Sequence, residues 1–157
     1  LGYQVIASTG RPETHKYLKQ LGASGFIDRN TLAAKAAPLG KERWAGVIDS
    51  VGSTTLANAL AQVKRYGCVA ACGLAGGFNL PATVFPFILR GVVLAGVDSV
   101  MAPMELRLEA WERLAKDLPT QKINDISSTK PMSKLPELAD DIVAGKTRGR
   151  IIIDVNA

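Results

Sequence analysis

The chain has 157 residues, 47% of them hydrophobic and 21% charged, which is the composition of an ordinary globular domain with a core of its own. Nineteen Lys and Arg against 14 Asp and Glu give a net charge of +5, which suits an anionic ligand such as a phosphorylated nucleotide or coenzyme A. The sequence has no apolar run of the roughly 18 residues that span a membrane, and no helix-turn-helix, zinc or aromatic stacking motif for nucleic acid. We therefore expect a small-molecule ligand, and neither a membrane nor a nucleic-acid partner.

The first segment, VIASTGRPETHKYLKQLGA, predicts a buried strand, a glycine turn and a helix. The strand is expected at residues 4–7 and the helix at residues 12–21, with Pro12 in its first turn and Gly22 as its stop. The preceding Leu1 and Gly2 have the pattern of a helix end that runs directly into a strand. We expect that the chain has lost its beginning.

The rest of the chain alternates short apolar runs with helical patterns, as in a parallel sheet that helices cover on both faces. Further strands are expected at residues 25–28, 46–51, 68–72 and 92–97, with a helix at residues 54–64. Amphipathic helices follow at residues 103–118 and 136–144, and RGRIIIDV ends the chain as a strand. The intervening KINDISSTKPMS is polar, and we expect turns there.

The cysteines and the histidine do not form a motif that binds metal. Cys68 and Cys72 lie four residues apart in a predicted strand, which directs both side chains to one face, and we expect packed thiols. His15 lies in a polar helix without a partner motif and is expected at the surface. These residues predict no metal site, and free thiols favour a reducing cytoplasm.

The carboxyl ends of the predicted strands are small, polar or glycine-rich, and ligands of open parallel sheets lie at these ends. The second strand of a dinucleotide fold commonly ends in Asp or Glu, which binds the adenosine ribose, whereas this chain has Thr9, Gly10 and Arg11 at that place. A guanidinium binds phosphate, so the turn favours NADP over NAD. Arg11 alone fits a solvated turn equally well, but Arg29 at the next strand end favours phosphate binding.

A second glycine-rich stretch, CGLAGG, follows the strand at residues 68–72. It lacks the G-x-G-x-x-G spacing of a phosphate loop and no capped helix follows it. We interpret it as a turn that lets the backbone approach a ligand, with a plain connection as the alternative. The apolar FPFILRG either lines the same cleft or packs in the core.

Four stretches together resemble one branch of a known superfamily: LGYQVIASTGRPETHKYLKQLGAS, WAGVIDSVG, VAACGLAGGFNLPATVFPFILRGVVLAGVDSVM and RGRIIIDV. They are similar to the acrylyl-CoA reductase branch of the medium-chain dehydrogenases/reductases, which includes quinone oxidoreductases of the YhdH type. The resemblance implies a zinc-free, NADPH-dependent reductase with a GroES-like catalytic domain and a Rossmann-like cofactor domain. Such an enzyme adds hydride to the β-carbon, and a proton to the α-carbon, of acryloyl-CoA or a related enoyl-CoA.

The resemblance also implies that the chain is the C-terminal half of such an enzyme. Residues 1–121 would be a partial NADP-binding domain, and residues 122–157 would return to the GroES-like domain. The doubly wound parallel α/β sheet would lack its first strand, which belongs between the strands at residues 4–7 and 46–51. The pyrophosphate loop and most of the substrate pocket would be missing too, so we expect the fragment to be inactive alone.

Eight cofactor contacts are implied by the resemblance, and none of them is a proton donor, so the catalytic residues stay unknown. Four lie on the adenosine side, at the 2′-phosphate or beside it. The other four are a backbone contact near the nicotinamide, two further contacts and one from the C-terminal segment. In chain order the eight are Thr9, Gly10, Arg11, Arg29, Leu74, Ile88, Ser99 and Arg150. A homodimer through the strand at residues 92–97 is also implied.

Two other functions stay open at this point. The first is an NADPH quinone oxidoreductase, because the pocket that distinguishes substrates would lie mostly outside this chain. The second is a non-catalytic module that binds or senses NADP, because the chain has no constellation of acid, base and nucleophile.

Overall fold

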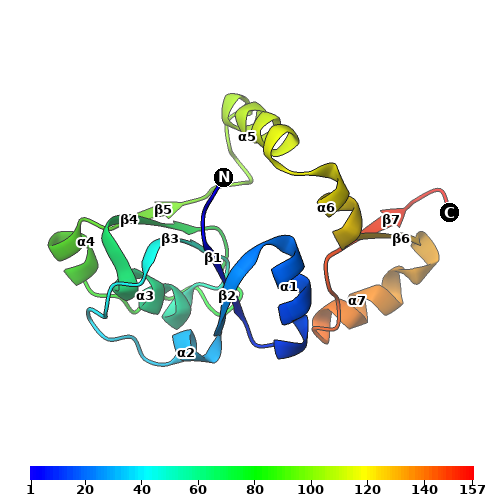
Figure 1. The fold of residues 1–157 in the computed structure, drawn as a ribbon. Coiled ribbons are helices and arrows are strands. Elements are labelled where there is room, and N and C mark those ends of the chain that lie inside the picture. The colour runs from blue at the N-terminus through cyan, green and yellow to red at the C-terminus, as the bar shows by residue number, and fades with distance from the viewer. The chain divides into compact units, whose positions relative to one another are not determined.

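The computed structural model describes all 157 residues, which form two compact units (Figure 1). One unit comprises residues 2–102, and the other comprises residues 103–157 together with Leu1. Both contain helices and parallel strands, so the predicted α/β class is confirmed. None of the helices is long and apolar enough to cross a membrane.

The unit of residues 2–102 alternates strands and helices, as the hydrophobic pattern predicts. Its strands are β1 (Val5–Thr9), β2 (Ala23–Asp28), β3 (Trp44–Asp49), β4 (Val63–Ala71) and β5 (Val93–Gly96). Its helices are η1 (Pro12–Thr14), α1 (His15–Leu21), α2 (Asn30–Ala33), α3 (Ser53–Gln62) and α4 (Phe85–Arg90). The short helix α2 and the helix α4 were not among the predicted elements.

These strands form two sheets, with the orders β1-β2 and β3-β4-β5. In the doubly wound order 3-2-1-4-5-6, one strand stands between the equivalents of β1 and β3. Here β1 and β3 each form the edge of a separate sheet, at the place where the first strand is predicted to be missing. All the pairings are parallel, as the strand–helix alternation predicts.

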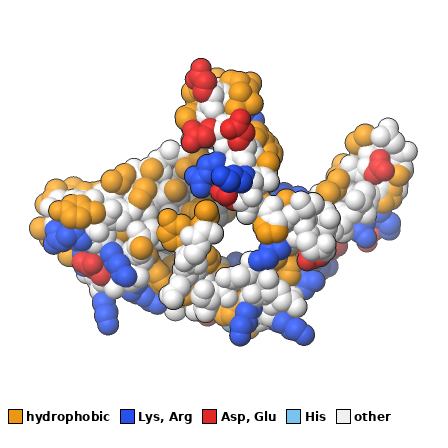
Figure 2. Space-filling model, turned by 45° about the horizontal axis from the view of Figure 1, so that its top comes forward, with side chains coloured by type: hydrophobic (Ala, Val, Ile, Leu, Met, Phe, Trp, Pro, Cys, Tyr) orange, Lys and Arg blue, Asp and Glu red, His pale blue; other side chains and the backbone are white.

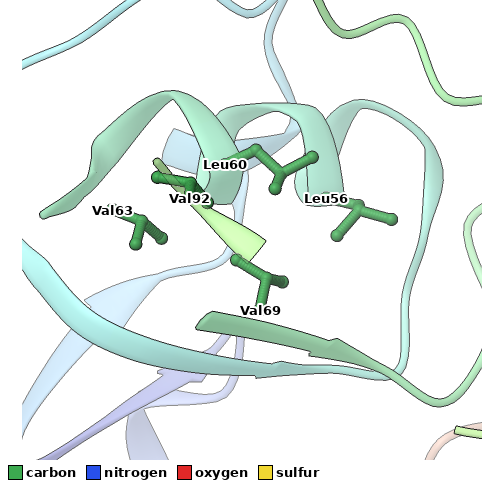
Figure 3. Close-up of a cluster of buried hydrophobic side chains, with 5 residues drawn as sticks. All are labelled: Leu56, Leu60, Val63, Val69 and Val92. Atoms are coloured by element: carbon green, nitrogen blue, oxygen red, sulfur yellow. The ribbon is translucent and has the colours of Figure 1, made fainter. Parts of the chain in front are cut away.

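The core of this unit lies between α3 and one face of the β3-β4-β5 sheet (Figure 3). Leu56 and Leu60 lie four residues apart on α3, so their side chains share one face of the helix. Burial of each contributes about 1.5 to 3 kcal/mol. The buried hydrophobic residues of this core are Leu56, Leu60, Val63, Val69 and Val92.

The other face of this sheet is open, and this overturns the prediction of packed thiols. Cys68 pairs in register with Gly46 and Val93, on the face opposite to Val69. Both Cys68 and Cys72 are exposed, and Val93 is 53% exposed. Hydrophobic side chains are visible at the surface of the molecule in Figure 2. The sequence fixes which residues share a face, but tertiary packing decides which face is covered.

The side chain of Arg90 ties the end of α4 to the segments around it. This guanidinium is 9% exposed and donates hydrogen bonds to the carbonyl oxygens of Ala61, at 3.0 Å, and Val63, at 3.2 Å. It also donates to the Gly40 carbonyl and pairs with Glu42 at 3.3 Å. FPFILRG therefore contains a helix that packs on the core through Pro86 and Phe87, while Phe85, Ile88 and Leu89 are exposed.

The unit of residues 103–157 contains α5 (Met104–Asp117), α6 (Thr120–Ile126), β6 (Ser127–Pro131), η2 (Met132–Lys134), α7 (Leu135–Val143) and β7 (Arg150–Asp154). The two amphipathic helices and the final strand are confirmed. The turns expected in KINDISSTKPMS are wrong, because this segment forms most of α6 and the strand β6, which pairs in parallel with β7. The predicted domain boundary at residues 121 and 122 falls inside α6 and stays a prediction.

Candidate functional site

The parallel pairing of β1 and β2 brings two strand ends to one edge of their sheet. Thr9 and Asp28 are partners in the register, so the residues that follow them leave the sheet side by side. The backbone N–H of Arg29 donates to the Thr9 carbonyl oxygen at 3.2 Å. This hydrogen bond places Arg29 beside Gly10, as expected from the sequence.

The guanidinium of Arg29 lies across Gly10. A Cβ atom added to Gly10 would stand 2.5 Å from Nε and 3.1 Å from Cζ of Arg29. No side chain fits at position 10 while Arg29 keeps this position. The absence of a side chain at Gly10 therefore leaves room for the Arg29 guanidinium close to the backbone of the turn.

Thr9 and Arg11 complete this cluster, and hydrogen bonds within the turn order its backbone. The Thr9 hydroxyl oxygen accepts the Arg11 N–H at 3.1 Å, which leaves the hydroxyl proton available for an external acceptor. The Arg11 carbonyl accepts both the N–H of Thr14, at 2.9 Å, and its hydroxyl, at 2.7 Å. Thr14 is buried at the start of the helical segment, so it anchors the turn to the fold.

The charge of this edge is positive near the turn. The segment from residue 4 to residue 12 has no acidic side chain, and Arg11 and Arg29 both follow strand ends. The nearest strand-end carboxylate, Asp28, accepts the N–H of Asn30 at 2.9 Å. Two guanidinium groups and one hydroxyl donor are the groups that bind a phosphate well. We refer to Thr9, Gly10, Arg11 and Arg29 as the arginine cluster.

A second feature lies at the carboxyl ends of β4 and β5. It is a shallow hollow of about 480 Å³ that is wide open to solvent. Leu74 stands on its rim with 65% of its surface exposed. Asp98 also lines the hollow, and its carboxylate accepts the N–H groups of Val100 at 3.1 Å and Met101 at 3.0 Å, which closes a turn around Ser99. The lining residues are Ala71, Cys72, Gly73, Leu74, Gly96, Val97 and Asp98.

The glycine turn beside this hollow is packed against the turn that follows β3. The Asp49 carboxylate, in a residue that is 4% exposed, accepts the Gly52 N–H at 2.8 Å. Gly52 has φ of 74°, and a Cβ on it would stand 2.5 Å from the Gly77 carbonyl oxygen. These glycines are therefore required by contact between two turns of the chain. Their presence alone does not indicate a ligand, although the turn still borders the hollow through Leu74. We refer to the turns at residues 49–53 and 72–77 as the glycine turns.

The structure brings together some of the predicted contact residues and not others. Arg29 lies against Gly10, whose chain neighbours are Thr9 and Arg11, while Leu74 borders the hollow that Asp98, next to Ser99, also lines. Ile88 lies on α4 with 69% exposure and is not among the residues that line the hollow. Arg150 begins β7 in the other unit.

Sequence reasoning assigned no role to Cys72, which lines the hollow. The signal that marks it is its position one residue after β4, at a strand end. Its thiol donates to the Asp49 carbonyl oxygen at 3.3 Å, so it also connects the two glycine turns. His15, expected at the surface, is partly buried and stacks on Phe26 with ring centroids 4.0 Å apart.

The family of zinc-binding dehydrogenases matches residues 1–116 of the chain. No three His, Cys, Asp or Glu side chains of the structure lie together so that they could hold a metal ion. The probable acrylyl-CoA reductase AcuI of Escherichia coli is 52% identical, over 99% of this chain and 48% of its own length. The putative quinone oxidoreductase YhfP of Bacillus subtilis is 44% identical, over 97% of this chain and 47% of its own.

Solved structures of such relatives also match nearly the whole of this chain. The crystal structure of E. coli YhdH with bound NADPH has a TM-score of 0.94 and 52% identity, and covers 99% of this chain and 48% of that one. The structure of B. subtilis YhfP with NAD bound has a TM-score of 0.92 and 42% identity, and covers 98% of this chain and 47% of that one. The chain thus spans about half the length of the relatives that it matches.

Proposed function

Because the chain belongs to the zinc-binding dehydrogenase family, we propose that it is the cofactor-binding half of an NADPH-dependent reductase for acryloyl-CoA or a related enoyl-CoA. The substrate class is supported by the similarity to the E. coli protein named a probable acrylyl-CoA reductase. When bound, NADPH supplies a hydride for the carbon–carbon double bond. The residues of this chain hold and orient that cofactor, and the proton donor comes from elsewhere in the protein.

One observation carries the choice of NADPH: the guanidinium of Arg29 lies across Gly10, and Arg11 follows Gly10 in the chain. A 2′-phosphate at this turn would meet the two guanidinium groups and the Thr9 hydroxyl. NADH has a ribose hydroxyl in place of that phosphate, and this turn has no carboxylate to accept its proton. The cluster therefore favours the phosphorylated cofactor.

The hollow beside Leu74 is the proposed place for the nicotinamide half. It lies at the carboxyl ends of β4 and β5, where parallel sheets bind ligands. In this proposal Leu74 contacts the cofactor through its backbone and Ser99 contacts it from the neighbouring strand end. Ile88 and Arg150 would complete the site once the rest of the protein is present.

A second candidate is an NADPH quinone oxidoreductase, and the Bacillus relative named a putative quinone oxidoreductase favours it. The two candidates differ in the electron acceptor and share the cofactor site. The structure of the Bacillus relative contains NAD. Cofactor choice therefore has to be measured directly for this protein.

Three further proposals concern the whole protein. Residues 122–157 would pack with a GroES-like catalytic domain. The strand β5 pairs on one side only, so its free edge would pair with a second copy in a homodimer. Cys68 and Cys72 form no disulfide, which suits a cytoplasmic enzyme.

The test of the proposed function is Arg11→Ala in the full-length protein, with acryloyl-CoA as substrate. Loss of the guanidinium is expected to reduce kcat/KM for NADPH about 5- to 160-fold, which corresponds to about 1 to 3 kcal/mol, and to leave the value for NADH nearly unchanged. The matched control is Lys16→Ala, which removes an exposed positive charge from α1 and should affect neither cofactor.

Steady-state rates with both cofactors and both substrates decide between the candidates. Equal losses with NADPH and NADH in the Arg11 variant would contradict the role of this turn. Reduction of a quinone without reduction of acryloyl-CoA would favour the second candidate.

A further inference from the structure

Gly10 has no backbone reason to be glycine. The residues with left-handed φ include seven glycines, and Gly10 is not one of them. An alanine at this position therefore meets no conformational strain from φ. The obstacle to a side chain is the guanidinium of Arg29, whose Nε would stand 2.5 Å from the added Cβ.

We propose that Gly10 is a positioning residue that gives the protein its preference for NADPH through Arg29. The space left by the missing side chain is where the Arg29 guanidinium lies, next to the turn that carries Arg11. This inference rests on the proposed function, because it concerns how the same site distinguishes a 2′-phosphate from a hydroxyl. It assigns the selectivity to a contact between two residues of the chain.

The contact restrains a side chain that would otherwise be mobile. Arg29 is exposed, and a free arginine at the surface has many rotamers. The backbone hydrogen bond to Thr9, at 3.2 Å, fixes where the side chain starts. Contact with the backbone of Gly10 then restricts the positions that the Arg29 guanidinium can take. Ordering a guanidinium before binding reduces the entropy lost when a phosphate binds.

A methyl group at position 10 would displace Arg29 at little cost to the fold. The nearest atoms are Nε, Cδ and Cζ of Arg29, at 2.5, 3.1 and 3.1 Å, and all three belong to the outer part of a flexible side chain. The guanidinium would rotate into solvent, away from the turn at Gly10. We expect folding to be maintained and phosphate recognition to weaken.

A competing explanation is that Gly10 is needed because the cofactor itself approaches the backbone there. The two explanations differ in their dependence on Arg29. If Gly10 acts through Arg29, its substitution has no further effect once the arginine is gone. If the ligand touches Gly10 directly, the methyl group remains harmful without Arg29.

The experiment is a double-mutant cycle in the full-length protein, with Gly10→Ala, Arg29→Ala and the double variant. Dissociation constants for NADPH and NADH are measured by nucleotide fluorescence, together with KM, kcat and Tm. The matched control is Gly40→Ala, whose Cβ would stand 3.1 Å from Cγ of Gln62, another flexible side chain. Gly10→Ser places the same Cβ and serves as a second variant.

We expect Gly10→Ala to weaken NADPH binding by about tenfold, the effect of one lost charge-assisted contact, with NADH binding, kcat and Tm unchanged. Arg29→Ala should match it, and the double variant should be no worse than Arg29→Ala. Additive losses, or equal losses for the two nucleotides, would overturn the inference. A wild-type protein that binds NADPH and NADH equally would overturn the proposed cofactor as well, whereas a selective Gly10→Ala variant would overturn this inference alone.

Discussion

At both Gly10 and Gly52 an added Cβ would clash with a neighbouring atom, but the two positions differ in which atom a side chain would displace. A Cβ on Gly10 would stand 2.5 Å from Nε of Arg29, and a Cβ on Gly52 would stand 2.5 Å from the Gly77 carbonyl oxygen. The first obstacle is the outer part of a flexible side chain. The second is backbone, in a segment that also bridges Gly52 to Gly77. The same substitution should therefore change ligand selectivity at Gly10 and stability at Gly52.

The difference reflects how the two regions are built. The arginine cluster follows a two-stranded sheet, and of its two cations Arg29 is exposed and Arg11 is partly buried. The glycine turns follow a three-stranded sheet with a buried core, and backbone hydrogen bonds join them, such as Cys72 N–H to the Asp49 carbonyl at 2.8 Å. Charge recognition is thus separated from the elements that hold the fold together.

Gly52→Ala should give the largest effect on stability. Gly52 has φ of 74° and ψ of −162°, a combination that is almost restricted to glycine, so alanine is expected to cost about 1 to 3 kcal/mol before the clash with Gly77 is added. Urea unfolding of the full-length protein measures this loss. The ratio of NADPH to NADH affinity should stay at the wild-type value.

Gly10→Ala is the natural comparison for that measurement. It should leave the unfolding midpoint unchanged and alter the nucleotide ratio. If Gly10→Ala destabilises the protein as much as Gly52→Ala does, the proposed separation between the two regions is wrong.

An exposed ion pair outside both regions should give the smallest effect. Nζ of Lys134 lies 2.8 Å from Oε2 of Glu137, and this hydrogen bond and charge lower the pKa of Glu137 and raise the pKa of Lys134. The Glu137 contribution to stability is present above its ordinary pKa and is lost as pH falls through the lowered value. The Lys134 contribution is present below its ordinary pKa and is lost as pH rises through the raised value. Stability due to this pair should therefore be constant between about pH 5 and pH 10.

An NMR titration of the Glu137 carboxyl checks this prediction. In Lys134→Met the pKa of Glu137 should return toward its ordinary value. A pKa that does not change would show that the pair makes no contribution in solution.

The sequence allowed the sheet and the arginine cluster to be predicted for local reasons. Apolar runs mark β1 to β5, and adjacent parallel strands bring their ends together, so Arg29 could be expected near Gly10. The contact between the Arg29 guanidinium and Gly10 depends on side-chain direction, which no pattern of residue types encodes.

Other features depended on contacts between distant segments. The strand β6 is polar and gains its backbone hydrogen bonds from β7, more than 20 residues later, so its sequence resembled a turn. The exposure of Cys68 follows from the open face of the β3-β4-β5 sheet, and the buried Arg90 follows from carbonyl groups on α3 and β4 and at Gly40. These features require the three-dimensional arrangement.

The most direct test of the central claim uses a ligand without a nicotinamide. Calorimetry of the full-length protein would compare adenosine 2′,5′-bisphosphate with adenosine 5′-monophosphate, which differ only in the 2′-phosphate. If the arginine cluster recognises that phosphate, the bisphosphate should bind at least about tenfold more tightly, and the difference should decrease with salt and disappear in a variant that lacks both Arg11 and Arg29. Equal affinity for the two nucleotides in the wild-type protein would contradict the claim.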